Sequence, residues 1–188
     1  MKKPFLVGIA GGSASGKSTL CKNLEIALGE LKIKSIHMDS YFRPEKDRPF
    51  TEAFVTGIKY LDDNHPLTMN LEQLKTDVKA LYNEEYDLII IEGLLTLWDD
   101  EICKMLDLKL FIDCEPDERL ARRIKRNMQK GLTMDEITSV YLDMVRYRHN
   151  EYVAPSKWRS DLIINGSWTS ELSLKIISEY IKNNYNDI

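Results

Sequence analysis

The hydrophobic residues of this chain follow two alternating patterns, short apolar runs and longer segments with helical spacing. Nearly continuous apolar runs, such as those at about 86–91 and 108–113, are typical of parallel strands that are covered on both faces. Together with shorter runs they predict strands at about 5–10, 34–38, 86–91, 108–113 and 161–164. The other segments predict helices at about 17–29, 70–82, 99–105, 116–130, 134–149 and 170–183. This alternation predicts an α/β fold, a doubly wound parallel five-stranded sheet that binds ligands at the carboxyl ends of its strands.

One stretch departs from this alternation. Between Ser40 and Met69 the apolar residues show no clear periodicity, and the stretch contains Pro44, Pro49 and Pro66. A loop of this length inside a compact domain is often functional. We therefore expect a long excursion at about 40–69 within a single domain that spans residues 1–188.

Composition narrows the class of protein. The chain has 188 residues, of which 43% are hydrophobic and 30% charged, and its net charge of −4 argues against general nucleic-acid affinity. No apolar run approaches the length of a membrane span, and residues 1–4 lead directly into the first strand without a signal peptide. The three cysteines lack C-x-x-C spacing, which predicts neither a disulfide framework nor a zinc site. We expect a cytoplasmic protein without a membrane or nucleic-acid partner, and a homo-oligomer stays open.

The most specific chemical signal follows the first strand. Residues 11–18 fit the pattern G-x-x-x-x-G-K-[ST], and they lie between a strand and a helix, as a phosphate-binding loop requires. The glycines let successive N–H groups converge on an anion, and the helix N-terminus adds partial positive charge. Lys17 would reach the β- and γ-phosphates, and Ser18 would ligate Mg²⁺; a chance Gly/Ser-rich turn is the alternative. The residues expected to bind a nucleoside triphosphate are Gly11, Gly12, Ser13, Ala14, Ser15, Gly16, Lys17, Ser18 and Thr19.

Acidic residues end two of the predicted strands. Asp39 follows the strand at 34–38, and Glu92 follows the strand at 86–91. In a parallel sheet both carboxylates would point toward the phosphate loop. Because Mg²⁺ prefers oxygen ligands, Glu92 could orient the metal directly or through water, whereas Asp39 could accept a proton from an attacking hydroxyl. The structural alternatives are a turn cap for Asp39 and a loop acid beside a turn glycine for Glu92.

A concentrated basic cluster occupies the helix predicted from Pro116. Its basic residues recur along one face at Arg119, Arg123, Arg126 and Lys130. Arginines here could brace a transferring phosphoryl group, and a solvated helix face is the alternative. Gly131 then breaks the helix, and Thr133 with Glu136 predicts a capping box that starts another. Two helices that meet at a glycine predict a mobile lid over the phosphates, at about 119–135.

In this order the motifs resemble the uridine kinase and phosphoribulokinase family over nearly the whole chain. The segments that carry the resemblance are 11–18, Asp39-Ser40-Tyr41-Phe42-Arg43, His65-Pro66, Ile91-Glu92-Gly93-Leu94-Leu95, 119–126, Pro155-Ser156-Lys157 and Asp161-Leu162-Ile163-Ile164. The resemblance implies a P-loop NTPase-type three-layer fold with a helical lid. It also implies phosphorylation, with ATP and Mg²⁺, of a hydroxyl on a nucleoside or similar riboside.

The resemblance also assigns roles by position. Asp39 resembles the family's catalytic base, and Ser18 and Glu92 resemble its magnesium ligands, with Asp39 close to the metal. Arg123 and Arg126 resemble its lid arginines, which act with Lys17. Asp62 or Asp63 resembles the acid that holds the ribose hydroxyls, and the sequence does not decide between these two residues. The residues expected at the acceptor are Asp39, Tyr41, Asp62, Asp63, His65 and Arg123.

The chain departs from uridine kinases at two places. Those kinases grip the pyrimidine with a hairpin between the helix after His-Pro and the third strand, whereas residues 81–86 here pass directly from helix to strand. The lid at 126–132 is also shorter and lacks further arginines. Kinases for nicotinamide riboside or pantothenate are therefore the alternatives within this chemistry.

Two other classes compete with a small-molecule kinase. A regulatory GTPase would want an N-K-x-D motif and a D-x-x-G motif after the third strand, and the chain has neither. A non-catalytic nucleotide-binding protein would not need Asp39 beside a cluster of arginines.

Overall fold

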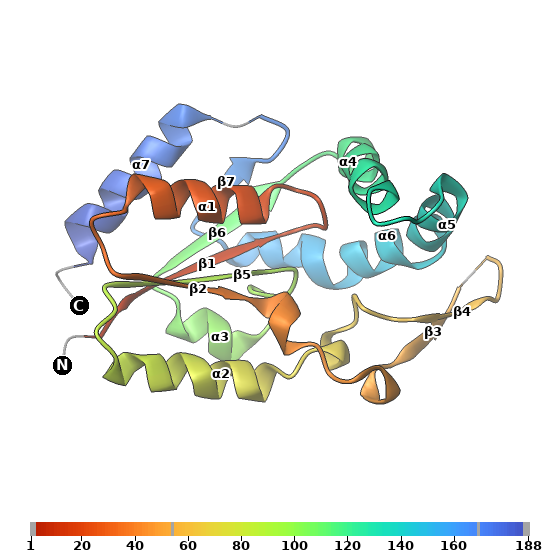
Figure 1. Ribbon diagram of the computed structural model, residues 1–188, viewed down its shortest axis with the longest axis horizontal. Helices are drawn as coiled ribbons and strands as arrows, with labels where there is room; N and C mark the ends of the chain where they lie inside the picture. Colours follow the sequence, from red (N-terminus) through yellow and green to blue (C-terminus); the bar gives the residue numbers. More distant parts are fainter. Residues whose placement is uncertain (1–2, 54, 169, 186–188) are drawn as a thin grey trace.

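A five-stranded parallel sheet forms the centre of the computed structural model, which describes residues 3–53, 55–168 and 170–185 (Figure 1). The strand order is β2-β5-β1-β6-β7, and each neighbouring pair is parallel. The bounds are β1 Phe5–Gly11, β2 Ile33–His37, β5 Leu88–Gly93, β6 Leu108–Asp113 and β7 Leu162–Asn165. The predicted α/β fold and its five strands are therefore confirmed.

Helices cover both faces of the sheet, because its central strands are apolar in both directions. These helices are α1 Lys17–Ala27, α2 Leu71–Ala80, α3 Asp100–Met105 and α7 Glu171–Asn184. Along β5, Ile89 and Ile91 join the core formed with α2 and α3, whereas Leu88 and Ile90 join the core formed with α1 and α7. Figure 1 shows α1 and α7 above the sheet and α2 and α3 below it. The result is the expected three-layer arrangement.

The two helices after β6 begin where the sequence predicted, and a glycine lies between them. α4 spans Pro116–Met128, α5 spans Met134–Val140, and Gly131 between them has a φ of 93°. The Thr133 hydroxyl accepts a hydrogen bond from the Glu136 N–H, and the Glu136 carboxylate accepts one from the Thr133 N–H. The capping box is therefore confirmed.

The helix predicted at 134–149 is longer and less regular than expected. After α5 the chain forms the π-helical turn η5 Tyr141–Val145, the short α6 Arg146–Arg148, the π-helical turn η6 His149–Val153 and the 3₁₀ segment η7 Ala154–Arg159. The spacing of apolar residues does not separate α-helical from π-helical geometry, so the sequence predicted one plain helix. None of the helices in the described part of the chain is long and apolar enough to cross a membrane.

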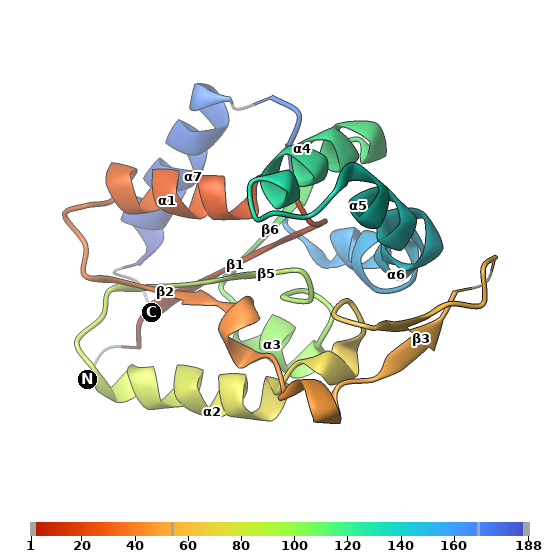
Figure 2. The ribbon, with the colours of Figure 1, turned by 45° about the vertical axis from the view of Figure 1, so that its right-hand side comes forward.

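The excursion at 40–69 is more ordered than predicted, because it contains a hairpin. β3 Phe50–Glu52 pairs antiparallel with β4 Lys59–Leu61, so that Thr51 lies opposite Tyr60. The 3₁₀ turns around it are η1 Met38–Tyr41, η2 Glu45–Asp47 and η3 Pro66–Thr68. Strands of three residues are too short for an alternating pattern to be visible in the sequence. The hairpin lies below α5 and α6 in both views (Figures 1 and 2).

The connection from α2 to β5 is short, as predicted. One 3₁₀ turn, η4 Leu81–Asn83, follows α2, and β5 begins at Leu88. The described chain therefore has no hairpin at the place where uridine kinases are expected to carry one.

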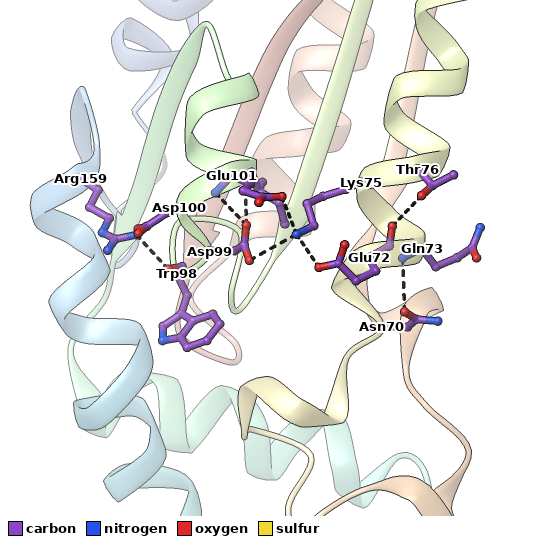
Figure 3. Close-up of polar contacts among 11 residues, drawn as sticks. Asn70, Glu72, Gln73, Lys75, Thr76, Trp98, Asp99, Asp100, Glu101 and Arg159 are labelled. Atoms are coloured by element: carbon purple, nitrogen blue, oxygen red, sulfur yellow. Dashed lines mark hydrogen bonds and ion pairs between the residues drawn. The ribbon is translucent and has the colours of Figure 1, made fainter.

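A buried lysine joins α2 to the loop that follows β5. Only 7% of the Lys75 side chain is exposed, and its Nζ lies 2.7 Å from Glu72, 2.8 Å from Glu101 and 4.0 Å from Asp99 (Figure 3). Asp99 also caps α3 by accepting hydrogen bonds from the N–H groups of Glu101 and Ile102. These contacts fix the start of α3, and with it the loop after the carboxyl end of β5.

Candidate active site

The loop between β1 and α1 has the conformation that a phosphate-binding loop needs. Gly11, Ala14 and Gly16 have φ values of 148°, 64° and 108°, and the Ser15 N–H donates to the Gly12 carbonyl at 3.1 Å. Such left-handed conformations favour glycine and turn the backbone sharply, so that its N–H groups converge. Among the described residues no side chain caps α1 at Gly16, and the first N–H groups of this helix stay available to an anion.

A cavity of about 570 Å³ lies in front of this loop. It is lined by residues 13–19 of the loop and by Asp39 and Glu92, the acids that follow β2 and end β5. Gly11 and Gly12 are buried and do not line it. Most of the residues that the sequence predicted for nucleotide binding therefore share one cavity with both predicted acids.

Lys17 lies inside the field of these two acids. Its Nζ donates to the Gly12 carbonyl at 3.0 Å. Burial lowers the pKa of the Lys17 ammonium, the carboxylates of Glu92 and Asp39 oppose this effect, and Arg126 adds to it. The Lys17 ammonium is therefore a partly desolvated positive charge at the N-terminus of α1, and a phosphate oxygen would bind to it strongly.

A hydroxyl and an imidazole meet on one oxygen of Glu92. Ser18 Oγ donates to Glu92 Oε1 at 3.0 Å, and His37 Nδ1 lies 2.8 Å from the same atom. The sheet register places His37 directly opposite Glu92, on the neighbouring strand. The sequence predicted roles for Ser18 and Glu92 but none for His37, because strand order and register are not visible in it.

The arginines of α4 fold over the phosphate-binding loop. Arg123 Nη1 and Arg126 Nη2 both donate to Ser13 Oγ, at 3.3 and 3.2 Å. Burial lowers the pKa of the Arg123 guanidinium, Arg126 lowers it further, and Tyr141 and Asp63 oppose this change. The basic face of this helix therefore meets the loop, and the alternative of a purely solvated face does not describe it.

Arg119 packs against the phosphate-binding loop. Its side chain is buried, its Nε donates to the Cys114 carbonyl at 2.9 Å, and its guanidinium packs against Gly12. A Cβ at position 12 would lie 2.6 Å from Arg119 Nη1, which explains why this position of the loop is glycine. Arg119 is thus a packing partner of the loop.

The far end of the cavity is built by residues that sequence reasoning did not assign. Arg122 lines it, and its Nη1 donates to the Gly166 carbonyl at 2.9 Å. Other residues at this end come from α1, from the end of β7, from the segment that follows β7 and from the first turn of α7; they are Leu20, Asn23, Asn165, Trp168, Ser170, Ser173 and Leu174. No motif marks this segment in the sequence, although a tryptophan, Trp168, follows a predicted strand. In the structure this tryptophan is exposed.

Two residues predicted at the acceptor, Tyr41 and His65, make contacts within the fold. The Tyr41 hydroxyl donates to Asp77 of α2 at 2.9 Å, and burial together with Asp77 raises the pKa of Tyr41 to about 12. His65 Nδ1 accepts from the Leu67 N–H and caps η3, while its ring packs edge-on against Tyr152 at 5.3 Å. Neither residue lines the cavity that contains Asp39, and the same holds for the other residues predicted at the acceptor, Asp62, Asp63 and Arg123.

The structure separates the two neighbouring acids that the sequence left open. Asp62 is fully buried, and its carboxylate accepts from Thr51 Oγ, Arg148 Nε and the Asn64 N–H. The Asp63 side chain is 52% exposed and pairs with Arg48 at 3.0 Å. Asp63 also lies close enough to Arg123 to stabilise its charge.

His149 predicts a pH dependence of stability. Burial lowers the pKa of His149 to about 4, Arg119, Lys17 and Lys157 add to the effect, and Asp113 opposes it. Its Nδ1 has no hydrogen-bond partner among the described residues. Because the unfolded chain takes up this proton near pH 6.5 and the folded chain only near pH 4, acid favours unfolding across that window.

We therefore expect the free energy of unfolding to fall more steeply in the wild type than in His149→Phe between pH 6.5 and 4, by up to roughly 3 kcal/mol. Urea unfolding at several pH values measures both curves. Parallel curves would show that the folded protein protonates His149 without cost.

Known proteins resemble this chain in sequence and in fold. A family model described as phosphoribulokinase / uridine kinase family matches residues 70–173. A uridine kinase of Clostridium botulinum (strain Okra / Type B1) is 33% identical over 97% of this chain and 98% of its own. A uridine kinase of Bacillus cereus (strain AH187) is 32% identical over 93% of this chain and 92% of its own.

Two solved structures share the fold at lower identity. Phosphoribulokinase from Rhodobacter spheroides superposes with a TM-score of 0.65 and 16% identity, over 88% of this chain and 71% of that protein. A possible uridine kinase from Bacillus stearothermophilus has a TM-score of 0.60 and 19% identity, over 88% of this chain and 90% of that protein.

Proposed function

Because this chain belongs to the phosphoribulokinase and uridine kinase family of small-molecule kinases, we propose that it transfers the γ-phosphoryl group of ATP to a hydroxyl of a nucleoside or similar riboside. The observation that supports this most is the meeting, in one cavity, of the phosphate-binding loop, Lys17 and the acids Asp39 and Glu92. A protein that only sensed nucleotide would have no use for an exposed acid beside the phosphates.

The residues around Ser18 fit a magnesium ion. Ser18 Oγ and Glu92 Oε1 are oxygen donors 3.0 Å apart, and Asp39 lines the same cavity. Mg²⁺ is usually held by one or two carboxylates with phosphates and waters. We infer that Ser18 and Glu92 would hold the ion, with Asp39 close to it. When bound, the ion would neutralise charge on the phosphates.

Asp39 has the exposure and the position of a general base. It would accept the proton of the acceptor hydroxyl while the hydroxyl oxygen bonds to the γ-phosphorus. The bond from that phosphorus to the bridging oxygen breaks, and ADP leaves. Lys17, Arg123 and Arg126 would stabilise the charge on the transferring group.

The far end of the cavity would take the nucleoside part of ATP. Arg122, Asn165 and Trp168 line it; Asn165 ends β7, whereas Asp39 follows β2, at the opposite edge of the sheet. An exposed tryptophan and an amide side chain suit a base that offers an aromatic face and polar edges.

Asp63 is the better candidate for the acid that holds the acceptor's ribose. Asp62 already accepts from three donors inside the fold. Asp63 is half-exposed, uses one carboxylate oxygen in the ion pair with Arg48 and lies in the field of Arg123. A carboxylate with free acceptor capacity can bind two neighbouring hydroxyls. Since the described chain lacks a hairpin between α2 and β5, we expect recognition of the ribose to outweigh recognition of the base.

A screen of acceptors tests the proposed function. ADP release would be measured with uridine, cytidine, nicotinamide riboside, other ribosides and pantothenate. We expect turnover with ribosides and none with pantothenate. Turnover with pantothenate alone would move the enzyme to the alternative acceptor class, and ADP release with no acceptor at all would contradict a kinase.

The lid arginines predict a specific kinetic defect. Arg123→Ala and Arg126→Ala should each lower kcat by about 10- to 10³-fold, because their charge is used on the transferring phosphoryl group. The KM for ATP should change much less, since a lid acts mainly in the closed state. Lys125→Ala, an exposed change on the same helix, is the control. Wild-type kcat in both arginine variants would contradict the lid.

We also infer a cytoplasmic location. All three cysteines are free thiols, and Cys21 and Cys114 are buried. Unpaired cysteines are typical of reducing compartments, where ATP is also available.

A further inference from the structure

The β3–β4 hairpin is attached to the helix that follows the lid by a buried acid. Asp143 in η5 is only 8% exposed. Its Oδ2 accepts hydrogen bonds from Thr56 Oγ at 2.8 Å and from Tyr60 Oη at 2.9 Å, both on the hairpin side. The Tyr60 ring packs on the small apolar cluster of Tyr141, Met144 and Val145.

Arg148 makes a second attachment. Its Nε donates to Asp62 at 2.6 Å, and its Nη2 donates to Thr51 Oγ, also at 2.6 Å. Thr51 Oγ in turn donates to Asp62, and Arg148 Nη1 pairs with Glu151. One guanidinium therefore holds a strand of the hairpin and the buried acid that follows it.

The π-helical turns explain how both attachments face the hairpin. Asp143 and Arg148 are five residues apart, which in an α-helix would place them on different sides. Asp143 lies in the π-helical turn η5, whose i→i+5 contacts bring residues five apart toward one side, and Arg148 ends the short helix α6 that follows directly. Such turns are rare and frequently lie at functional sites.

The consequence concerns the neighbouring acid. Because Asp62 is held by Arg148 and Thr51, the backbone that carries Asp63 is fixed relative to the helix after the lid. Asp63 stays half-exposed and within the field of Arg123. We propose that Arg148 is a positioning residue for the acceptor, which holds the Asp62–Asp63 turn where Asp63 can meet the acceptor beneath the lid. This inference rests on the proposed function.

A structural brace and a positioning residue predict different kinetics. A brace alone would affect folding and leave the acceptor KM unchanged. A positioning residue should raise the acceptor KM and leave the KM for ATP unchanged, because the phosphate-binding loop makes none of these contacts. Arg148→Gln removes the charge and keeps a polar side chain, and Arg146→Gln is the matched control, because Arg146 is exposed on the same short helix.

The experiment uses the full chain, ATP and the riboside that the wild type phosphorylates, with uridine tried first. We expect Arg148→Gln to raise the acceptor KM by about 10- to 100-fold, as for loss of a charged hydrogen bond, with the KM for ATP within about two-fold of the wild type. Hydrogen exchange should become faster in residues 50–63 and stay unchanged in β1. Arg146→Gln should match the wild type in all three measurements.

Tyr60→Phe covers the case in which Arg148→Gln does not fold, since it removes one hydroxyl and keeps the ring. Tyr60→Phe should also raise the acceptor KM, by a smaller factor than Arg148→Gln. A wild-type acceptor KM in the folded variants, with faster exchange in the hairpin, would overturn the positioning role and leave the proposed function intact. Absence of turnover by the wild type with every acceptor would overturn both, and it would be seen before any variant is made.

Discussion

Asp39→Asn is expected to lower kcat by about 10²–10⁴-fold, the usual contribution of a general base. The amide has the size of the carboxylate but cannot accept a proton from the acceptor hydroxyl. Asp39 is exposed and lines the cavity, and its side chain makes no hydrogen bond or ion pair with the described residues, so stability and ATP affinity should change little. Steady-state kinetics and urea unfolding measure these quantities, and Asp47→Asn, an exposed change in the same excursion, is the control.

A magnesium titration separates the two roles proposed for Asp39, general base and magnesium ligand. If the variant has only lost a metal ligand, excess Mg²⁺ should restore its kcat. If it has lost the base, the defect should persist at saturating metal. Full activity of Asp39→Asn at ordinary Mg²⁺ would rule out both roles. The acceptor would then need another acid, and Glu92 also lines the cavity.

Lys17→Ala should lower kcat by about 10²–10³-fold, because it removes a positive charge from the phosphoryl group in a partly desolvated site. The free energy of unfolding should not fall. Burial disfavours this ammonium, as the lowered pKa of Lys17 shows, so its removal relieves an unfavourable interaction of the folded state. Lys22→Ala on the exposed side of α1 is the control.

Kinetics at saturating ATP and urea unfolding test this pair of expectations. Near-normal turnover of Lys17→Ala at saturating ATP would contradict the assignment of the phosphate-binding loop. A large loss of stability would show that Lys17 also holds the loop through the Gly12 carbonyl.

The features that the sequence predicted well are local or strongly apolar. Strands β1 and β5 are buried on both faces, so their apolar runs stand out, and the phosphate-binding loop is a continuous motif. The acids at the ends of β2 and β5 could be expected together because parallel strands finish at one edge.

What the sequence did not predict depends on contacts between distant segments. The pairing of His37 with Glu92 depends on strand order and register. The end of the cavity that Trp168 lines depends on where the segment between β7 and α7 lies in the fold. Tyr41 and His65 lie in recognisable motifs, but their partners Asp77 and Tyr152 come from other helices. The β3–β4 hairpin was missed because its strands are too short to show a period.

The packing of Arg119 against Gly12 limits how this chain can vary. Any side chain at position 12 would meet a guanidinium that the Cys114 carbonyl holds in place. We therefore expect Gly12→Ala to be tolerated better when position 119 is shortened at the same time. A mutant library that varies position 12 alone would sample side chains for which Arg119 must shift, whereas one that varies positions 12 and 119 together would also contain pairs that fit without this shift.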